Sequence, residues 1–141
     1  MLKSSKPFVG YANGASHSTH NLSSTTWSIF SPSGELVSFQ GICVGQSTKN
    51  ITEYGGLIEL LSDAISLGIH CIIIRMDTQL VVLQFTSVYI VQNQAIHHMF
   101  LRGRLLERHF DYIQYKYISK KINTLTDSLE NYVLNRHLQH M

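Results

Sequence analysis

The order of the sequence patterns in this 141-residue chain predicts an α/β fold, a five-stranded mixed sheet with helices on both faces. Two observations lead to this prediction. Three strand-like segments precede any helical spacing, and helical and strand-like segments follow one another after them. In the middle, an amphipathic helix is followed at once by the β-branched run Cys71 to Ile74, which is typical of a buried strand.

The first three segments predict an antiparallel meander. Residues 6–11 form the first expected strand, which leads into the stretch 12–16 and then into a polar loop. Residues 25–30 alternate apolar and polar side chains, as a half-buried strand does. A turn is expected at 31–34, where Pro comes early and Gly late, and residues 35–45 return as the third strand.

The central helix is expected to start at Thr52, whose side chain can cap it, with Glu53 in the first turn. Apolar residues recur at helical spacing as far as Leu67, and Gly68 is typical of a helix end. The strand that follows stops at Asp77. It therefore delivers a carboxylate at its C-terminal end, where open α/β sheets bind ligands.

The rest of the chain predicts two helices at 78–85 and 95–109, a strand at 111–118 and a last helix at 123–138. The second of these helices carries three basic residues, Arg102, Arg104 and Arg108. These arginines fit either contacts with nucleic-acid phosphates or a solvated helix face.

Composition and charge favour a single domain spanning residues 1–141. Hydrophobic residues make up 44% and the net charge is only +2, so the chain has no strong overall electrostatic footprint for nucleic acid. No apolar run reaches the ~18 residues of a membrane span, and no signal peptide is visible. Cys43 and Cys71 are expected to be buried thiols of an intracellular protein, cytoplasmic or nuclear.

The stretch TEYGGLIELLSDAISLGI, followed by a strand and by MDTQLVVLQ, resembles the ribonuclease H family in the form carried by plant LTR-retrotransposon polyproteins. The resemblance extends over nearly the whole chain and implies the ribonuclease H-like fold. It also implies hydrolysis of the RNA strand of an RNA/DNA hybrid with two divalent cations, Mg²⁺ or Mn²⁺. The implied partners are an RNA/DNA hybrid or other nucleic acid, and other polyprotein domains or a larger complex.

The resemblance assigns roles to individual residues. Glu53, Asp77 and Asp127 match three of the four metal-binding catalytic positions, but the family's DGAS motif reads Asn13-Gly14-Ala15-Ser16 here. An amide offers one neutral oxygen where a carboxylate offers charge and a second oxygen, so Asn13 predicts weakened metal binding and impaired catalysis. Tyr117 stands where the family often has His. The matching substrate-binding positions are Gly14, Ser16, Lys120 and Asn123.

Each carboxylate also has a purely structural interpretation, because Glu53 fits a first-turn helix acid and Asp77 and Asp127 fit helix caps. Their occurrence together, in this order and inside matching flanks, favours the inherited site. Two hypotheses remain: a hybrid-binding nuclease domain weakened by Asn13, and a catalytically inactive, domesticated copy kept as a binding or assembly module. A small-ligand α/β protein is disfavoured, because the chain has no glycine-rich phosphate loop.

Overall fold

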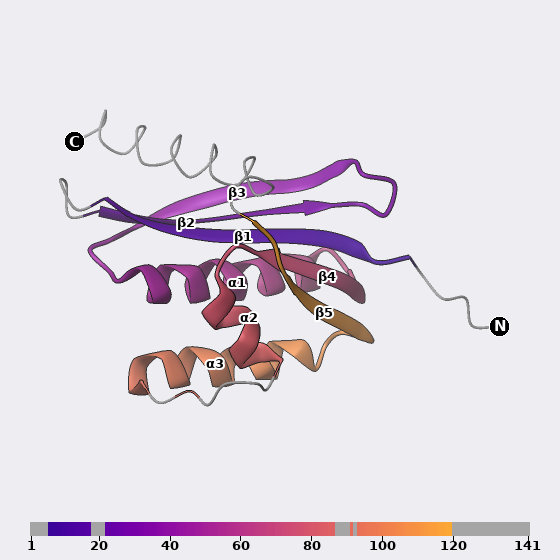
Figure 1. Ribbon diagram of the computed structural model, residues 1–141. Coiled ribbons are helices and arrows are strands. Elements are labelled where there is room, and N and C mark those ends of the chain that lie inside the picture. The colour runs from indigo at the N-terminus through magenta and orange to yellow at the C-terminus, as the bar shows by residue number, and fades with distance from the viewer. Residues whose placement is uncertain (1–5, 18–21, 87–90, 92, 120–141) are drawn as a thin grey trace.

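The computed structural model describes residues 6–17, 22–86, 91 and 93–119, and for 15–17 the backbone alone. Within these residues the chain forms five strands and three helices, arranged as a sheet with helices packed beneath it (Figure 1). The predicted order of elements is confirmed as far as residue 119, and the predicted helix 123–138 lies outside the described residues. The elements are β1 Phe8–His17, β2 Leu22–Phe30, β3 Leu36–Gly45, α1 Lys49–Ser66, β4 Cys71–Met76, α2 Gln79–Phe85, α3 Gln94–Glu107 and β5 Tyr112–Tyr117.

The sheet is mixed, as predicted, with the strand order β3-β2-β1-β4-β5. The first three strands pair antiparallel, whereas β4 runs parallel to β1 and β5 runs parallel to β4. All three described helices lie on the same side of the sheet (Figure 1). None of the helices in the described part of the chain is long and apolar enough to cross a membrane.

The core lies between this sheet and α1. Leu57, Leu60 and Leu61 of α1 are fully buried, as are the alternate residues Ile72 and Ile74 of β4. Burial of such a side chain stabilises the fold by roughly 1.5–3 kcal/mol relative to exposure. Because β4 lies between β1 and β5 in the described sheet, the β-branched run that predicted a buried strand is explained by its place there.

Helix α1 begins one turn earlier than the sequence predicts. Thr48, not Thr52, is the N-cap, and its side chain accepts a hydrogen bond from the Ile51 N–H at 3.3 Å. Thr52 is buried inside the helix, where its hydroxyl donates to the Lys49 carbonyl at 2.7 Å. The expected cap was wrong because two threonines four residues apart are equivalent locally, and tertiary packing selects the outer one. The predicted end is confirmed, with Gly68 at a φ of 76°.

Strand β1 is longer than predicted, because it continues through residues 12–17 in register with β2. Glycine weakens a strand by local propensity, which explains why the prediction stopped early. The structure shows why glycine is used at Gly14: a Cβ there would lie 2.6 Å from the Glu53 backbone nitrogen. The close approach of β1 and α1 therefore depends on this residue.

Candidate active-site cleft

A polar cleft of about 310 Å³ opens where β4 and β5 end and α1 and α2 begin. It brings together Glu53 of α1 and Asp77, which directly follows β4. Parallel strands end at the same edge of a sheet, and this is where open α/β sheets bind ligands. The cleft is lined by Lys49, Asn50, Glu53, Asp77, Thr78, Gln79 and Tyr117.

Asp77 does not cap α2, because Thr78 occupies the N-cap position. Its Oδ2 atom is buried and has no hydrogen-bond partner among the described residues. Leaving a buried acceptor unsatisfied costs about 1–3 kcal/mol, and more when the group is charged. The helix-cap interpretation of Asp77 is therefore wrong, and this oxygen fits a site that is completed by a ligand.

Glu53 lies in the second turn of α1 and is 1% exposed. The first turn of the helix holds no acidic residue, so the interpretation of Glu53 as a first-turn acid is wrong. The backbone next to Glu53 is held by the sheet, where the Thr25 hydroxyl of β2 donates a short hydrogen bond to the Thr52 carbonyl. Strand β2 and Gly14 of β1 thus fix the position from which Glu53 enters the cleft.

Asn13 occupies the position on β1 that corresponds to Asp77. The last parallel pair of β1 and β4 is Ala12 with Met76, so Asn13 and Asp77 are the residues that come directly after this pair. Asn13 is 2% exposed and is not among the residues that line the cleft. Its Oδ1 accepts a hydrogen bond from the Gly14 N–H at 2.9 Å. The amide is therefore packed next to the site and its oxygen is engaged by the backbone.

The other predicted site residues are placed as follows. Gly14 is buried against α1, and Ser16 pairs with Ser23 in the hairpin register. Asp127, Asn123 and Lys120 lie outside the described residues. No group of three His, Cys, Asp or Glu side chains suited to a metal ion occurs in the described part of the chain. The described site consists of two carboxylates, with Tyr117 53% exposed at the end of β5.

The sequence-based predictions missed four lining residues, Lys49, Asn50, Thr78 and Gln79. The first two precede Thr52, where the helix was expected to begin. With the helix starting earlier, Lys49 lies four residues before Glu53 and hence on the same helix face. The signal that could have found Lys49 and Asn50 is Thr48, because a cap at Thr48 places both residues in the first turn of the helix.

A second cavity of about 280 Å³ adjoins the cleft and shares Asn50 with it. Thr48 and Asn93, the N-caps of α1 and α3, both line it, so two helix N-termini with their partial positive charge meet there. Gln84 also lines it and is 6% exposed. The buried Tyr54 hydroxyl donates to the Gln84 amide oxygen, which leaves the Gln84 NH₂ group as the donor available to the cavity.

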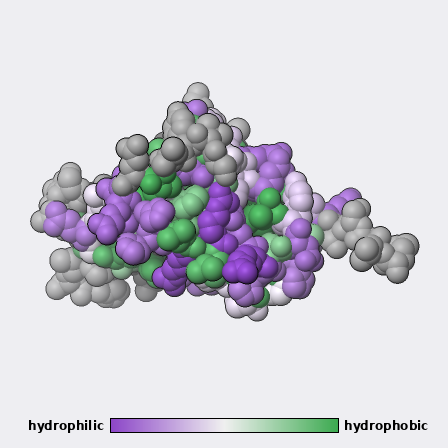
Figure 2. Space-filling view, turned by 90° about the horizontal axis from the view of Figure 1, so that it is seen from below, coloured by the Kyte–Doolittle hydropathy of each residue, from purple (hydrophilic) through white to green (hydrophobic). Residues whose placement is uncertain are grey.

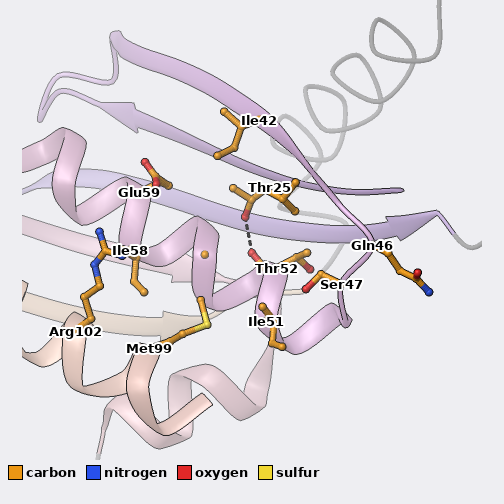
Figure 3. Close-up of a pocket in the computed structure, with 12 residues that line it drawn as sticks. Thr25, Ile42, Gln46, Ser47, Ile51, Thr52, Ile58, Glu59, Met99 and Arg102 are labelled. Carbon is orange, nitrogen blue, oxygen red and sulfur yellow. Dashed lines mark hydrogen bonds between the residues drawn. The ribbon is translucent and has the colours of Figure 1, made fainter. Parts of the chain in front are cut away.

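A third depression, of about 360 Å³, lies between β3, α1 and α3 and is mainly apolar (Figure 3). Ile42, Ile58 and Met99 contribute to its walls, whereas Glu59 and Arg102 are its charged residues. The Thr25 hydroxyl that lines it is already bonded to the Thr52 carbonyl. On the helix side of the molecule hydrophobic patches alternate with hydrophilic ones (Figure 2). This depression offers a surface for contact and no converging reactive groups.

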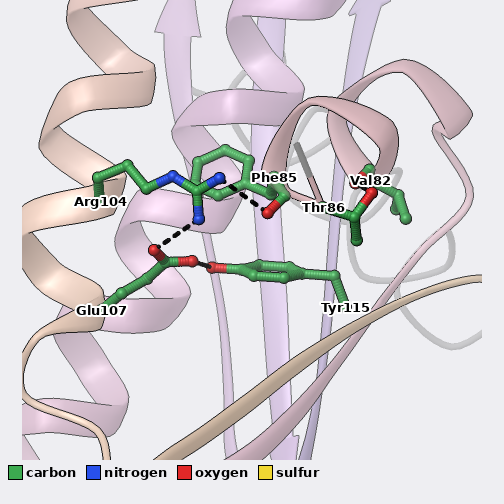
Figure 4. Close-up of polar contacts among 6 residues, drawn as sticks. All are labelled: Val82, Phe85, Thr86, Arg104, Glu107 and Tyr115. Atoms are coloured by element: carbon green, nitrogen blue, oxygen red, sulfur yellow. Dashed lines mark hydrogen bonds and ion pairs between the residues drawn. The ribbon is translucent and has the colours of Figure 1, made fainter. Parts of the chain in front are cut away.

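The three arginines in and directly after α3 do not act alike. Arg102 and Arg108 are exposed. Arg104 instead donates to Glu107 and to the Phe85 carbonyl, both at 2.9 Å (Figure 4). Its guanidinium also lies 4.8 Å from the Phe100 ring centre. It is therefore neither a phosphate contact nor part of a solvated face. The interpretation of all three as one basic surface was wrong for Arg104.

The hydroxyl of Tyr115 donates a short hydrogen bond to the second carboxylate oxygen of Glu107 (Figure 4). The five residues joined in this way form the Arg104 cluster: Phe85, Phe100, Arg104, Glu107 and Tyr115. Burial, together with the negative charge of Glu107 and this hydrogen bond, raises the pKa of Tyr115. The phenol is thus held in its neutral form, in which it can donate. The cluster connects α3 to β5 and to the end of α2.

The fold is that of a ribonuclease H-like domain. Residues 11–133 match the family model described as reverse transcriptase-like, and the chain belongs to this family of ribonuclease H domains. The crystal structure of RNase H1 from Halobacterium salinarum superposes with a TM-score of 0.87 at 28% identity, covering 92% of this chain and 98% of that one. The N-terminal RNase H domain of rv2228c from Mycobacterium tuberculosis gives 0.89 at 26% identity, covering 96% and 99%.

Two curated relatives agree with this assignment. The ribonuclease HI of Halobacterium salinarum is 30% identical over 125 residues, which are 89% of this chain and 63% of that protein. The bifunctional protein Rv2228c of Mycobacterium tuberculosis is 33% identical over 88 residues, or 62% of this chain. The chain spans only 24% of the length of Rv2228c. A structure of LC11-RNase H1 in complex with RNA/DNA hybrid, 21% identical with a TM-score of 0.86, shows the same fold.

Proposed function

We propose that this chain binds RNA/DNA hybrid at the polar cleft, and that its cleavage of the RNA strand is impaired by Asn13. The observation that carries the proposal is the buried Asp77 Oδ2 atom, unpartnered among the described residues, in the same cleft as Glu53. LC11-RNase H1, which shares the fold, was crystallised with such a hybrid. The free thiols of Cys43 and Cys71 suit an intracellular protein.

The donor set fits a hard divalent cation such as Mg²⁺ or Mn²⁺. Carboxylate oxygens are the protein ligands that such a cation prefers. The Oδ2 atom of Asp77 has no hydrogen-bond partner among the described residues and can therefore serve as one. Glu53 and Asp77 would hold the cation, together with Asp127 from beyond the described residues. When bound, it supplies electrostatic stabilisation of charge on the reacting phosphate oxygens. The packing around Glu53 fixes the position of this ligand and keeps it out of bulk water.

Asn13 weakens this site in two ways. It contributes no charge next to Asp77, and its oxygen already accepts from Gly14. Tyr117, at the mouth of the cleft, stands where the family often has His, and a phenol is a poorer proton acceptor than an imidazole. Substrate positioning is less affected, since the neighbouring cavity offers two helix N-termini and the Gln84 amide to a phosphate.

The experiment compares three proteins, namely the unmodified chain, Asn13→Asp, and Asn13→Asp combined with Asp77→Asn. Binding and cleavage of a labelled hybrid are measured with Mg²⁺ at low salt. Because the net charge is +2, binding should be modest and should weaken steeply with salt. Asn13→Asp should raise the cleavage rate about 10²–10³-fold, as restoring one charge-stabilising group typically does. The double variant should lose this gain.

An unmodified chain that is already as active as Asn13→Asp would show that Asn13 does not limit catalysis. No binding at low salt would reject the hybrid-binding proposal altogether.

A second candidate function is a catalytically inactive binding or assembly module within a larger complex. It is favoured by β3, an edge strand of the described sheet that contains no charged residue. Four large hydrophobic residues on it are exposed, namely Leu36, Val37, Ile42 and Val44. Natural edge strands are normally protected by charges, so an unprotected one suits a partner. An Asn13→Asp variant that binds hybrid and stays inert would favour this function.

A further inference from the structure

Strand β3 is the longer and the less protected of the two outer strands of the described sheet. It has 10 residues and no charged side chain, whereas β5 at the other edge has 6 and carries the exposed Lys116. Short length and lysine are two ways in which natural edge strands avoid pairing with another chain. The outward N–H and C=O groups of β3 have no strand beside them in the described sheet, and a second extended backbone is what pairs a whole row of such groups.

The part of β3 that can form an unbroken ladder lies in its middle. The register between β2 and β3 is irregular near both ends of the pairing. Between the two irregularities, residues 38–43 pair without interruption with residues 24–29. A strand added to the outer edge therefore meets a regular partner along residues 38–43.

This middle part fits a second copy of itself in the antiparallel direction. Opposite side chains of two paired strands lie on the same face and the faces alternate, so the two-fold axis of such a pair passes through a residue position. The two registers that keep residues 38–43 best paired are centred on Gln40 and on Gly41. A centre at Gly41 sets glycine opposite glycine, whereas a centre at Gln40 sets Phe39 of each copy opposite Gly41 of the other. The second register is the better one, because an aromatic ring covers the space that an edge glycine leaves empty.

We propose that β3 is a homodimer interface, at which two copies of the chain pair antiparallel about a two-fold axis at Gln40 and extend the sheet across both. The Gln40 amide suits the axis, because it can both donate to and accept from its own copy. The pairing brings together no like charges and covers part of the exposed apolar surface of the strand. Since a paired edge is a small interface, the dimer is weak and reversible.

The proposal specifies a partner for the assembly-module function, the second candidate above, and rests on the same strand. It is independent of cleavage, because none of the residues that line the cleft lies on β3.

The first experiment is sedimentation equilibrium at low salt over a range of concentrations, where the unmodified chain should show a monomer–dimer equilibrium. Gln40→Lys and Gln40→Glu each place two like charges about 5 Å apart across the axis and should weaken dimerisation about fourfold in a water-like dielectric. An equimolar mixture of the two variants should form a mixed dimer about 15-fold more tightly than either dimerises alone, because the charges are then opposite. These differences should vanish near 1 M salt, where the Debye length is about 3 Å.

The matched controls are Gln114→Lys and Gln114→Glu, the same changes at an exposed glutamine of β5 on the other edge. They should leave dimerisation unchanged and gain nothing on mixing. Circular dichroism checks the fold of every variant, because Gln40 Nε2 lies 3.4 Å from Asp63 Oδ2 and a charge at position 40 changes that contact.

The second experiment needs no variant. Amide hydrogen exchange of the unmodified chain should slow within residues 38–43 as the concentration rises, and should stay constant in β5.

A chain that stays monomeric up to about 1 mM would overturn the proposal and leave the edge to a strand of a different protein. A dimer that the Gln40 variants leave intact, or whose mixture gains nothing, would place the interface elsewhere and overturn it as well. Hybrid binding is measured separately, and its absence would reject the proposed function of the cleft without affecting the dimer.

Discussion

Two groups of charged side chains among the described residues differ in how their hydrogen bonds are satisfied, namely the Arg104 cluster of α3 and β5 and the cleft that contains Glu53 and Asp77. In the cluster, both carboxylate oxygens of Glu107 are bonded, one to Arg104 and the other to Tyr115. In the cleft, Asp77 keeps a buried oxygen without a partner among the described residues. A charge whose bonds are complete is satisfied within the fold and is costly to break, whereas one whose bonds are incomplete is available for a ligand. The difference separates a structural ion pair from a candidate site within one small domain.

Alanine at a glycine in each region should give the largest contrast. In Gly14→Ala the new Cβ would lie 2.6 Å from backbone atoms of α1, which cannot yield without moving Glu53. In Gly103→Ala the new Cβ would lie 2.7 Å from the edge of the Phe85 ring, which can shift. Alanine also favours the helix over glycine by about 1 kcal/mol, which offsets part of the clash. We expect losses in the free energy of unfolding of about 3 kcal/mol and about 1 kcal/mol respectively, measured by urea denaturation. Equal losses would contradict the described packing of α1 on β1.

Removing one charge from each region should change stability in opposite directions. Arg104→Met leaves Glu107 without its ion pair, and because the Arg104 side chain is 32% exposed we expect a loss of about 2 kcal/mol. Asp77→Asn removes an unpaired buried charge and should raise the free energy of unfolding by about 1 kcal/mol in metal-free buffer.

Denaturant unfolding in the presence of EDTA measures both effects, with exposed Arg108→Met as the control for the first. A destabilised Asp77→Asn protein would mean that this carboxylate is satisfied in solution and that the contrast between the regions is smaller than described.

The pH dependence of stability sharpens the comparison further, through Tyr115 of the Arg104 cluster and Tyr54, which packs against Phe85. Burial raises the pKa of Tyr115 and of Tyr54 above the usual value. Above pH ~10 the unfolded chain releases these protons while the folded chain retains them, so stability falls as pH rises. One tyrosine contributes a slope of about 1.4 kcal/mol per pH unit. Tyr115→Phe should flatten the decline between pH 10 and 11 by about 1 kcal/mol, because an unfolded phenol is only half ionised at pH 10. Tyr112→Phe, at an exposed residue of the same strand, is the control. Equal slopes in Tyr115→Phe and the unmodified chain would refute the burial of this phenol.

Local patterns in the sequence determined the order of the elements and their types. Helical spacing up to Leu67, the glycine at 68 and the β-branched run after it encode burial and backbone conformation directly. They also placed Asp77 at the end of a strand, which the structure confirms. The family followed from the same stretch, and the reverse transcriptase-like match confirms it.

Tertiary structure alone decided which of two similar residues takes each role. The choice of Thr48 over Thr52 as the cap depends on the packing of α1 against Gly14 and Thr25, which lie far away in the sequence. That choice in turn brings Lys49 into the cleft. Likewise, Arg104 differs from Arg102 only because one guanidinium finds Phe85, Phe100 and Glu107 within reach. Sequence spacing specifies which face of an element a side chain occupies, but its partners come from elements that only the fold brings together.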